Sequence, residues 1–183
     1  MQKREETKEK IIYAAIECIE KHRLSGTTTR NISELAQVNV SAISYYFQGI
    51  DNLLNEVFSK TLENAFRIDD ISVEENDDYK TVIRKILINW LAGAYAYPNI
   101  TRAHLDSIVN STNQKNILFE KMNNFLNIFY ELLVKHGMID DGIGMDKLKS
   151  LFSALLGHII LNGFKKNPDK DELFIDFVLA GFN

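Results

Sequence analysis

Hydrophobic residues recur at helical spacing along almost the entire chain, and this periodicity restricts the fold more than any other feature. In an α-helix, side chains three and four positions apart share one face. Ile11, Ile12, Ala15, Ile16 and Ile19 show this spacing near the N-terminus, and similar stripes continue toward the C-terminus. The 183 residues include only two prolines and nine glycines, so few positions can interrupt a helix. The sequence therefore predicts an all-α protein of about nine helices.

Boundary residues divide this pattern into helices of unequal length. Long helices are expected over about Glu5–His22 and Asp51–Phe66, with two short helical segments between them. Residues 69–78 carry six acidic side chains and no basic one, and such a charge run favours a solvated connection. Beyond it, Pro98 and Gly137 separate further apolar stripes. The pattern predicts a small N-terminal helical part joined to a larger helical part.

The two short segments have the pattern of a helix-turn-helix. Thr27 and Thr28 are good N-caps for the first segment, and Gly49 ends the second. The second helix of this motif enters the DNA major groove, where small side chains approach base edges and hydroxyl groups reach phosphates. The stretch SAISYYFQG, residues 41–49, offers small residues and three adjacent rings. Phe47 is expected to turn inward while the two tyrosines face DNA; the alternative is that all three rings belong to the core.

The candidate DNA contacts combine this helix with the start of the helix before it. Arg30 lies in the first turn of that earlier helix, which makes it the candidate for a base contact from outside the recognition helix. The alternative is that Arg30 is a solvated surface arginine. The candidate DNA-binding residues are Thr28, Arg30, Val40, Ser41, Ala42, Ser44, Tyr45 and Tyr46.

The span from about Lys8 to Leu54 resembles the DNA-binding domain of the TetR family of transcriptional regulators. Its informative part reads TTTRNISELAQVNVSAISYYFQGIDNLL. The resemblance covers about a third of the chain. It implies a helix-turn-helix domain at residues 1–49, a connecting helix at 50–67, and an effector-binding and dimerisation domain over residues 50–183. The residues that carry the resemblance are Thr27, Thr28, Ile32, Ala36, Val38, Tyr46, Phe47, Leu53 and Leu54.

Three positions of the N-terminal part depart from the family's pattern. Gln37 stands where a turn glycine is usual, so either its backbone tolerates a left-handed conformation or the turn differs slightly. Asn39 replaces a serine or threonine and can cap the third helix equally well. Arg23 occupies a common glycine position.

A further departure concerns charge. Ile50 stands where a lysine usually contacts phosphate, so one salt-dependent contact is missing. The cations left for phosphate near the N-terminus, expected in a flexible arm, are Lys3, Arg4 and Lys8.

The resemblance implies a dimer built from the last two long helices, and the apolar pattern supports it. The stripe that begins at Leu148 is wide, and the final helix looks too short to cover it. A second copy of the chain would bury this stripe in a four-helix arrangement, and symmetric DNA half-sites also require a dimer. The expected dimer-interface residues are Leu148, Leu151, Phe152, Leu155, Ile159, Phe174 and Phe177.

The resemblance also implies an effector pocket in the C-terminal half. Side chains there mix apolar bulk with a few polar tips, as small-molecule sites do, although aromatic residues at helical spacing also serve as plain core. Such a pocket suits a small, mostly apolar or aromatic effector, and the Asp51–Phe66 helix would couple it to the DNA-binding domain. The candidate pocket residues are Trp90, Tyr95, His104, Met122, Phe125 and Phe129.

Composition and motif searches exclude other classes. The net charge of −4 argues against indiscriminate binding to polyanions. The single cysteine, Cys18, excludes an internal disulfide and fits a reducing cytoplasm. The N-terminal MQKREETKEK has no apolar run, so no signal peptide is expected, and no stretch suits a membrane span. The four histidines lack ligand spacing, so no metal, no cofactor and no enzyme activity are expected.

We therefore expect a cytoplasmic TetR-like repressor that binds a palindromic operator as a homodimer and is released by a small effector. One alternative is a regulator controlled by a protein partner, which a sealed core near Trp90 and His104 would favour. Another is a helical interaction module with weakened DNA binding. Ile50 motivates that second alternative, as does the charge of residues 1–67, where nine Lys/Arg balance nine Asp/Glu.

Overall fold

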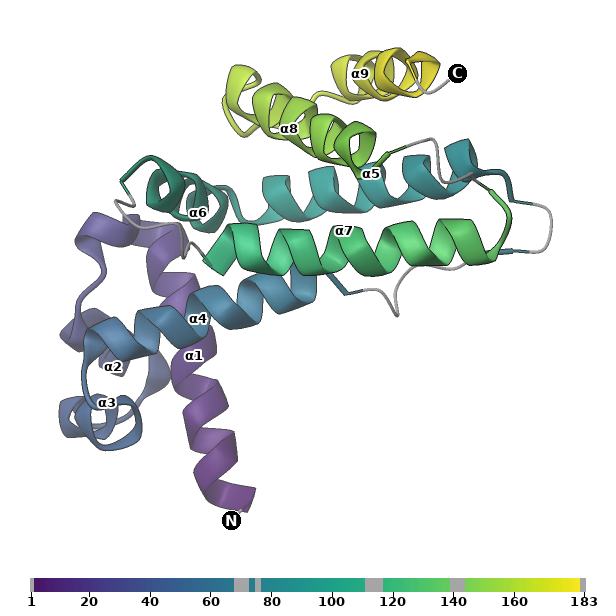
Figure 1. Cartoon of the computed structure of the whole chain (residues 1–183). Coiled ribbons are helices and arrows are strands. Elements are labelled where there is room, and N and C mark those ends of the chain that lie inside the picture. The colour runs from purple at the N-terminus through teal and green to yellow at the C-terminus, as the bar shows by residue number, and fades with distance from the viewer. Residues whose placement is uncertain (1, 68–72, 75–76, 111–116, 139–143, 182–183) are drawn as a thin grey trace. The chain divides into compact units, whose positions relative to one another are not determined.

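The computed structural model describes residues 2–67, 73–74, 77–110, 117–138 and 144–181. All regular structure in these residues is helical, which confirms the all-α prediction (Figure 1). None of their helices is long and apolar enough to cross a membrane. In chain order the nine α-helices and one short 3₁₀ helix of the described residues are α1 (Gln2–His22), η1 (Leu24–Gly26), α2 (Thr29–Ala36), α3 (Val40–Phe47), α4 (Ile50–Ala65), α5 (Tyr79–Ala96), α6 (Pro98–Asn110), α7 (Ile117–Lys135), α8 (Met145–Leu161) and α9 (Pro168–Ala180).

The helices pack into two compact units. The first unit holds residues 1–64 and 97–118, which contain α1 to α4 and α6. The second unit holds residues 65–96 and 119–183, which contain α5, α7, α8 and α9. The predicted functional boundary at residue 50 stays a prediction, because packing alone assigns no function. Residues 69–72 and 75–76 of the predicted acidic connection lie outside the described residues.

Apolar side chains from α1, α2, α3 and α4 form the core of the first unit. The apolar stripe predicted for α1 is buried here, as its helical spacing required. Burying one such aliphatic side chain contributes roughly 1.5–3 kcal/mol, so the short helices α2 and α3 depend on this packing for their stability. The largest completely buried side chains of the core are Ile11, Ile19, Ile32, Ile43 and Leu53.

Helix α6 joins the first unit through an apolar contact and through hydrogen bonds to α1. Ile100 is 3% exposed and belongs to the same core cluster. The Glu20 carboxylate accepts hydrogen bonds from the backbone N–H groups of Asn99, at 3.2 Å, and Ile100, at 2.7 Å. These N–H groups lie in the first turn of α6, where the helix itself offers no acceptor and where a negative charge meets the positive end of the helix dipole. Glu20 therefore caps α6 from a different helix.

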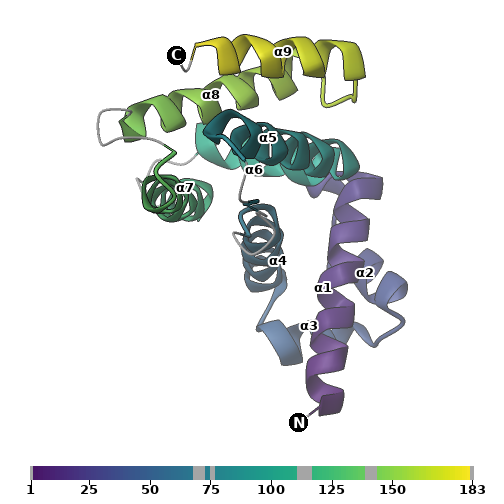
Figure 2. The same cartoon turned by 90° about the vertical axis from the view of Figure 1, so that its right-hand side faces the viewer.

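The core of the second unit is formed by α5, α7, α8 and α9. Figure 2 shows α9 alongside α8, and α5 contacts both of these helices. Arg84 on α5 forms ion pairs with Glu172 and Asp176 on α9. The largest completely buried side chains of this core are Ile83, Leu87, Leu126, Leu133, Leu148, Leu155 and Ile175.

A buried histidine joins α6 to α4 within the first unit. His104 is 7% exposed, and its Nε2 lies 3.0 Å from the Thr61 hydroxyl oxygen. The centroids of the His104 and Phe58 rings lie 5.0 Å apart. Burial lowers the pKa of His104 from 6.5 to about 4, because the charged imidazolium would lose its hydration in this position.

We predict that acid destabilises the protein through His104. Between pH 6.5 and about 4 the imidazole binds a proton in the unfolded chain but not in the folded one. The unfolded state therefore binds more protons, and the free energy of unfolding falls as the pH falls through this window. From pH 7 to pH 5 the loss is about 2 kcal/mol, which denaturant titrations at the two pH values measure.

The matched variants for this prediction are His104→Gln and His136→Gln, since His136 is exposed on the surface. The first replaces the imidazole by a group that does not titrate and can still hydrogen-bond Thr61, so its pH dependence should be flatter. His136→Gln should show the same pH dependence of the free energy of unfolding as the unaltered protein. Equal losses in all three proteins would contradict the assignment to His104.

Candidate nucleic-acid interface

The backbone between α2 and α3 reverses at Gln37. Gln37 has φ 52° and ψ 48°, which is the left-handed conformation and the first of the two alternatives expected there. The N–H of Val38 donates to the Ser33 carbonyl at 3.0 Å and closes the end of α2. The Asn39 side chain accepts a hydrogen bond from the N–H of Ser41 at 3.0 Å, so Asn39 caps α3 as predicted.

Helix α3 has one buried and one exposed face. Ile43 and Phe47 are 0% and 3% exposed and pack in the core of the first unit, which confirms the inward orientation predicted for Phe47. The opposite face offers two hydroxyl groups, one small apolar side chain and one ring. We call it the α3 face; its residues are Val40, Ser41, Ser44 and Tyr45, and Tyr45 is 70% exposed.

Two further candidate contact residues of α3 lie at the edge of this face. Ala42 and Tyr46 are half-buried and pack against the core of the first unit. The Tyr46 ring meets the Tyr45 ring edge-on, with centroids 5.0 Å apart. Of the two tyrosines that the sequence directed toward DNA, Tyr45 is fully available, while Tyr46 shares its surface with the core.

Thr28 and Arg30 stand at the start of α2. The Thr28 side chain accepts a hydrogen bond from the N–H of Asn31 at 3.2 Å and caps the helix; its hydroxyl still has a proton to donate. Arg30 Nε donates to a carboxylate oxygen of Glu34 one turn later, at 3.0 Å, and its side chain is 83% exposed. An exposed pair of this kind contributes about 0.3–0.5 kcal/mol, so Arg30 can exchange Glu34 for DNA at little energetic cost.

The N-terminal cations differ from the prediction. Helix α1 begins at Gln2, so the expected flexible arm is wrong: Lys3, Arg4 and Lys8 belong to the helix, because residues 2–10 are mostly good helix formers and include no proline or glycine. Lys8 forms an ion pair with Glu56 of α4 at 2.7 Å. Ile50, at the start of α4, is half-buried against the core of the first unit, so an apolar anchor replaces the family's usual cation there.

Comparisons with known proteins agree with this geometry. A family model described as bacterial regulatory proteins, tetR family, matches residues 11–57. The Bacillus subtilis (strain 168) protein named probable HTH-type transcriptional regulator YttP is 28% identical over 166 residues, which cover 85% of this chain and 72% of that protein.

Solved structures share the fold over nearly the whole chain. A TetR family transcription regulator from Marinobacter aquaeolei VT8 has a TM-score of 0.71 at 15% identity, covering 98% of this chain and 97% of that one. The transcriptional regulator FadR from Bacillus subtilis, in complex with stearoyl-CoA, has a TM-score of 0.73 at 17% identity, covering 94% of this chain and 98% of that one.

The capped turn, the exposed α3 face and these matches define a non-enzymatic helix-turn-helix DNA-binding protein. This chain is a TetR-family transcriptional regulator with the family's all-α fold.

Five of the six candidate effector residues lie in the second unit, where aromatic rings pack closely together. The Trp90 ring centroid lies 5.0 Å from that of Phe125 and 5.2 Å from that of Phe152. Phe125 and Phe129 stack at 5.7 Å. The indole N–H of Trp90 donates to the Ala65 carbonyl at 2.9 Å, so its polar tip is satisfied inside the chain. The five residues are Trp90, Tyr95, Met122, Phe125 and Phe129.

The sixth candidate, His104, belongs to the first unit and makes its contacts there with Thr61 and Phe58. Its inclusion with the other five in one effector pocket stays a prediction.

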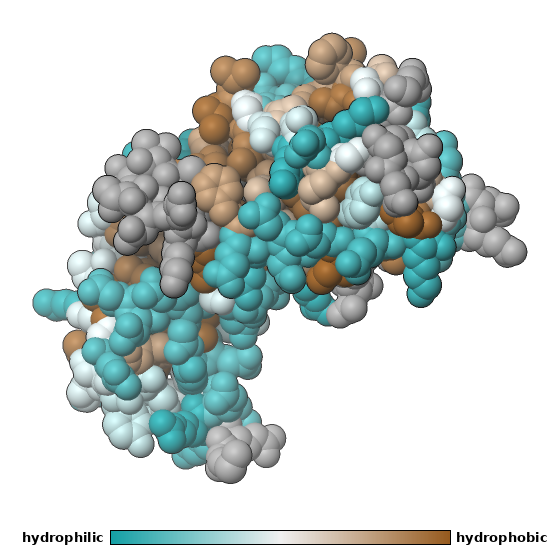
Figure 3. All heavy atoms as spheres, in the orientation of Figure 1, coloured by the Kyte–Doolittle hydropathy of each residue, from teal (hydrophilic) through white to brown (hydrophobic). Residues whose placement is uncertain are grey.

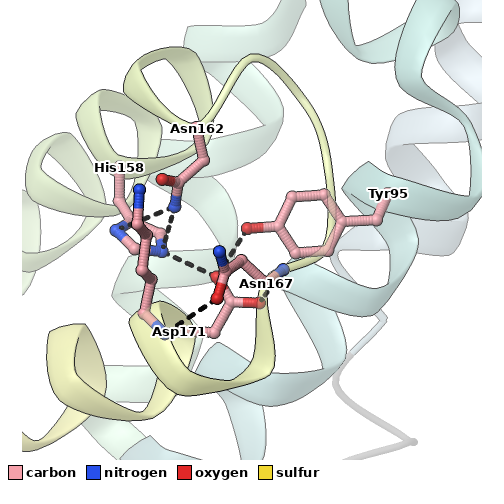
Figure 4. A network of polar contacts seen from close by, with 6 residues as sticks. Tyr95, His158, Asn162, Asn167 and Asp171 are labelled. Atoms are coloured by element: carbon pink, nitrogen blue, oxygen red, sulfur yellow. Dashed lines mark hydrogen bonds and ion pairs between the residues drawn. The ribbon is translucent and has the colours of Figure 1, made fainter.

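A buried carboxylate joins three helices of the second unit (Figure 4). Asp171, in the first turn of α9, is 8% exposed. One carboxylate oxygen accepts from the Tyr95 hydroxyl at 2.7 Å and lies 2.7 Å from Nε2 of His158, while the other accepts from the N–H of Asn167 at 3.2 Å. His158 must donate in this pair because a carboxylate only accepts. Burial and the hydrogen bond to Asp171 raise the pKa of Tyr95, so its hydroxyl keeps its proton.

Sequence reasoning missed this cluster. It singled out Tyr95 as a pocket residue, but it assigned no role to Asp171 or His158. The three residues lie on three helices, and no spacing rule joins them. Among the described residues, no group of three His, Cys, Asp or Glu side chains is placed to hold a metal ion, and Cys18 is a buried free thiol.

We predict that Asp171→Asn destabilises the protein by about 2–3 kcal/mol, because Tyr95 and His158 lose a charged acceptor in a buried position. Denaturant titration measures the change in the free energy of unfolding. The control is Asp169→Asn, which alters another acidic residue in the same first turn that is exposed. That change should stay within about 0.5 kcal/mol. A loss in Asp171→Asn no larger than in the control would show that the cluster does not hold the helices.

Five of the seven predicted dimer residues are buried in the core of their own chain. Helix α8 contacts both α5 and α9. These two helices therefore cover the apolar stripe of α8 that a second copy of the chain was expected to bury. The prediction that these five residues form the dimer interface is therefore wrong. It considered only α9 as a cover for the stripe, whereas α5 also packs against α8. The buried residues are Leu148, Leu151, Phe152, Leu155 and Ile159.

Other hydrophobic side chains of α8 and α9 reach the surface instead (Figure 3). Phe177, a predicted interface residue, is 78% exposed. Phe174 is half-buried, and its ring stacks on that of His158 with centroids 4.2 Å apart. We call the exposed set the α8–α9 surface; it consists of Ile160, Leu161, Leu173 and Phe177.

Proposed function

We propose that this regulator is a repressor that binds a palindromic operator as a homodimer and is released by a small effector. The observation that carries the proposal is the α3 face, which is open while Ile43 and Phe47 anchor the helix from behind. Small side chains let the helix approach base edges, and Tyr45 offers a hydroxyl to phosphate. Thr28 and Arg30 would add contacts from α2, and Ala42 and Tyr46 would add contacts through their exposed parts. Such a protein works in the cytoplasm, beside the DNA.

The α8–α9 surface supports a homodimer. Ile160, Leu161, Leu173 and Phe177 leave between 51% and 89% of their surface open on two adjacent helices. A second copy of the same surface would remove this apolar area from water and place two recognition helices on one palindrome. Phe174, half-buried at its edge, would contribute its remaining surface.

The aromatic cluster of the second unit supports a mostly apolar or aromatic effector. The residues that would line its site are Trp90, Tyr95, Met122, Phe125 and Phe129, and FadR, which shares the fold, was solved with stearoyl-CoA. The signal would pass along α4, because the boundary between the two units falls at its last residue, Ala65. Binding of the effector would then lower the affinity for the operator.

One observation favours a second candidate, a regulator controlled by a protein partner. The Trp90 ring lies in contact with the rings of Phe125 and Phe152, so a small molecule must displace side chains to enter among them. Trp90 reports on this directly. Titration with fatty acyl-CoA and with aromatic compounds should change the Trp90 fluorescence and release the operator. Operator binding that persists after a bound compound has changed the fluorescence would favour control by a partner.

The experiment that tests the function is selection of binding sites from genomic fragments by the purified protein at two salt concentrations. A dimeric regulator should select a palindrome and bind it more weakly as salt rises. Failure to select any site at low salt would sink the repressor proposal and favour an interaction module instead.

We predict that Tyr45→Ala weakens binding to the selected site by about 1–2 kcal/mol, or roughly fivefold to thirtyfold, because one phosphate or sugar contact is lost. Electrophoretic mobility shift or fluorescence anisotropy measures the change. Tyr13→Ala is the control, since Tyr13 is an exposed tyrosine of the same unit on α1. Equal losses in the two variants would show that Tyr45 makes no specific contact.

We predict that Phe177→Asp converts the homodimer into monomers, because it places a charge in the apolar α8–α9 surface. Sedimentation velocity measures the oligomeric state. Ile88→Asp is the control: Ile88 is an exposed apolar residue of α5 outside this surface, so its variant should stay dimeric. A dimer that survives Phe177→Asp would place the interface elsewhere.

A further inference from the structure

The start of α1 lies against the aromatic end of α3. The guanidinium carbon of Arg4 lies 5.9 Å from the centroid of the Tyr45 ring, and Nζ of Lys8 lies 5.6 Å from that of Phe47. Arg4 and Lys8 are four residues apart and therefore share one face of α1. Arg4 therefore lies over the exposed ring of Tyr45, and Lys8 lies over the buried ring of Phe47.

These two cations differ in what neutralises them. Lys8 forms an ion pair with Glu56 at 2.7 Å and lies over a ring that is only 3% exposed. Arg4 is exposed and has no acidic partner within ion-pair distance among the described residues. Its ring partner, Tyr45, belongs to the α3 face and is 70% exposed. The charge of Arg4 is therefore open to an outside anion at the place where the recognition helix meets its target.

The position of Arg4 is unfavourable for the helix alone. Arg4 and Lys3 stand in the first turn of α1, where the helix dipole is positive and basic side chains are destabilising. The contact with Tyr45 fixes the guanidinium next to an electron-rich ring face but does not neutralise it. A phosphate would supply the missing negative charge, and a guanidinium held in one plane suits the paired oxygens of a phosphate.

We propose that Arg4 is a phosphate-contact residue that acts with Tyr45 as one unit on the DNA backbone. The guanidinium and the Tyr45 hydroxyl would donate to the same phosphate group. Arg4 would thereby supply, from α1, the cation that Ile50 does not supply at the start of α4. The inference rests on the proposed binding of DNA by the α3 face.

The salt dependence of binding to random-sequence duplex DNA tests this directly, without a known operator. Each neutralised phosphate contributes about 0.9 to the slope of log K against log salt. Arg4→Gln should lower that slope by about 0.9 per protomer and weaken binding several-fold at about 50 mM salt. Lys10→Gln removes an equal charge from the same helix, at an exposed position outside the Arg4–Tyr45 contact, and should change the slope much less.

Arg4→Lys keeps the charge and separates a phosphate contact from a purely structural role. It should retain the slope of the unaltered protein, with a moderate loss of affinity because a lysine lacks the planar fork. Tyr45→Phe keeps the ring and removes the hydroxyl. Combined with Arg4→Gln, it should weaken binding by less than the product of the two single effects, because both groups serve one phosphate.

Three results would overturn the inference: a slope unchanged in Arg4→Gln, an equal fall in Lys10→Gln, or a lowered slope in Arg4→Lys. Binding of no duplex DNA by the unaltered protein is a different outcome, since it defeats the proposed function itself. Circular dichroism of each variant shows whether α1 is intact. If Arg4→Gln loses helix, the salt slope of Arg4→Lys decides the inference instead.

Discussion

The packing of Ile43 and Phe47 into the core of the first unit is the contact on which the DNA-binding surface depends. Helix α3 has eight residues, too few to be stable alone in water. Its orientation therefore comes from these two side chains and from its caps at Asn39 and Gln48. Once they are buried, the period of the helix alone decides that Ser41, Ser44 and Tyr45 face outward.

Polar contacts inside each unit join helices that are distant in the sequence. Glu20 caps α6, His104 meets Thr61 of α4, and Asp171 connects α9 to α5 and α8. No buried side-chain nitrogen or oxygen of the described residues is left without a hydrogen-bond partner. Apolar burial is tolerant of small shifts, whereas a buried polar group is costly unless its one partner is in place. These contacts therefore fix which helices meet and at which residues.

The sequence predicted the features of the fold and the site that depend only on neighbouring residues. The left-handed Gln37, the Asn39 cap and the inward Phe47 each depend on a few neighbouring residues and on known backbone preferences. Predictions that needed distant helices were less accurate. The sequence predicts an interface at the Leu148–Ile159 stripe, although α5 and α9 cover it. It predicts a flexible arm that includes Arg4, although the helix brings Arg4 onto Tyr45.

The sequence by itself determined that the chain is helical and that it carries a helix-turn-helix, because helical period, caps and turn conformation are properties of adjacent residues. Only the tertiary structure decided that α6 packs with the N-terminal helices, that Asp171 meets Tyr95 and His158, and which apolar surface of α8 and α9 stays open. Two apolar stripes look alike in a sequence. Which of them is covered depends on the partner helices that loops and buried polar contacts bring against it.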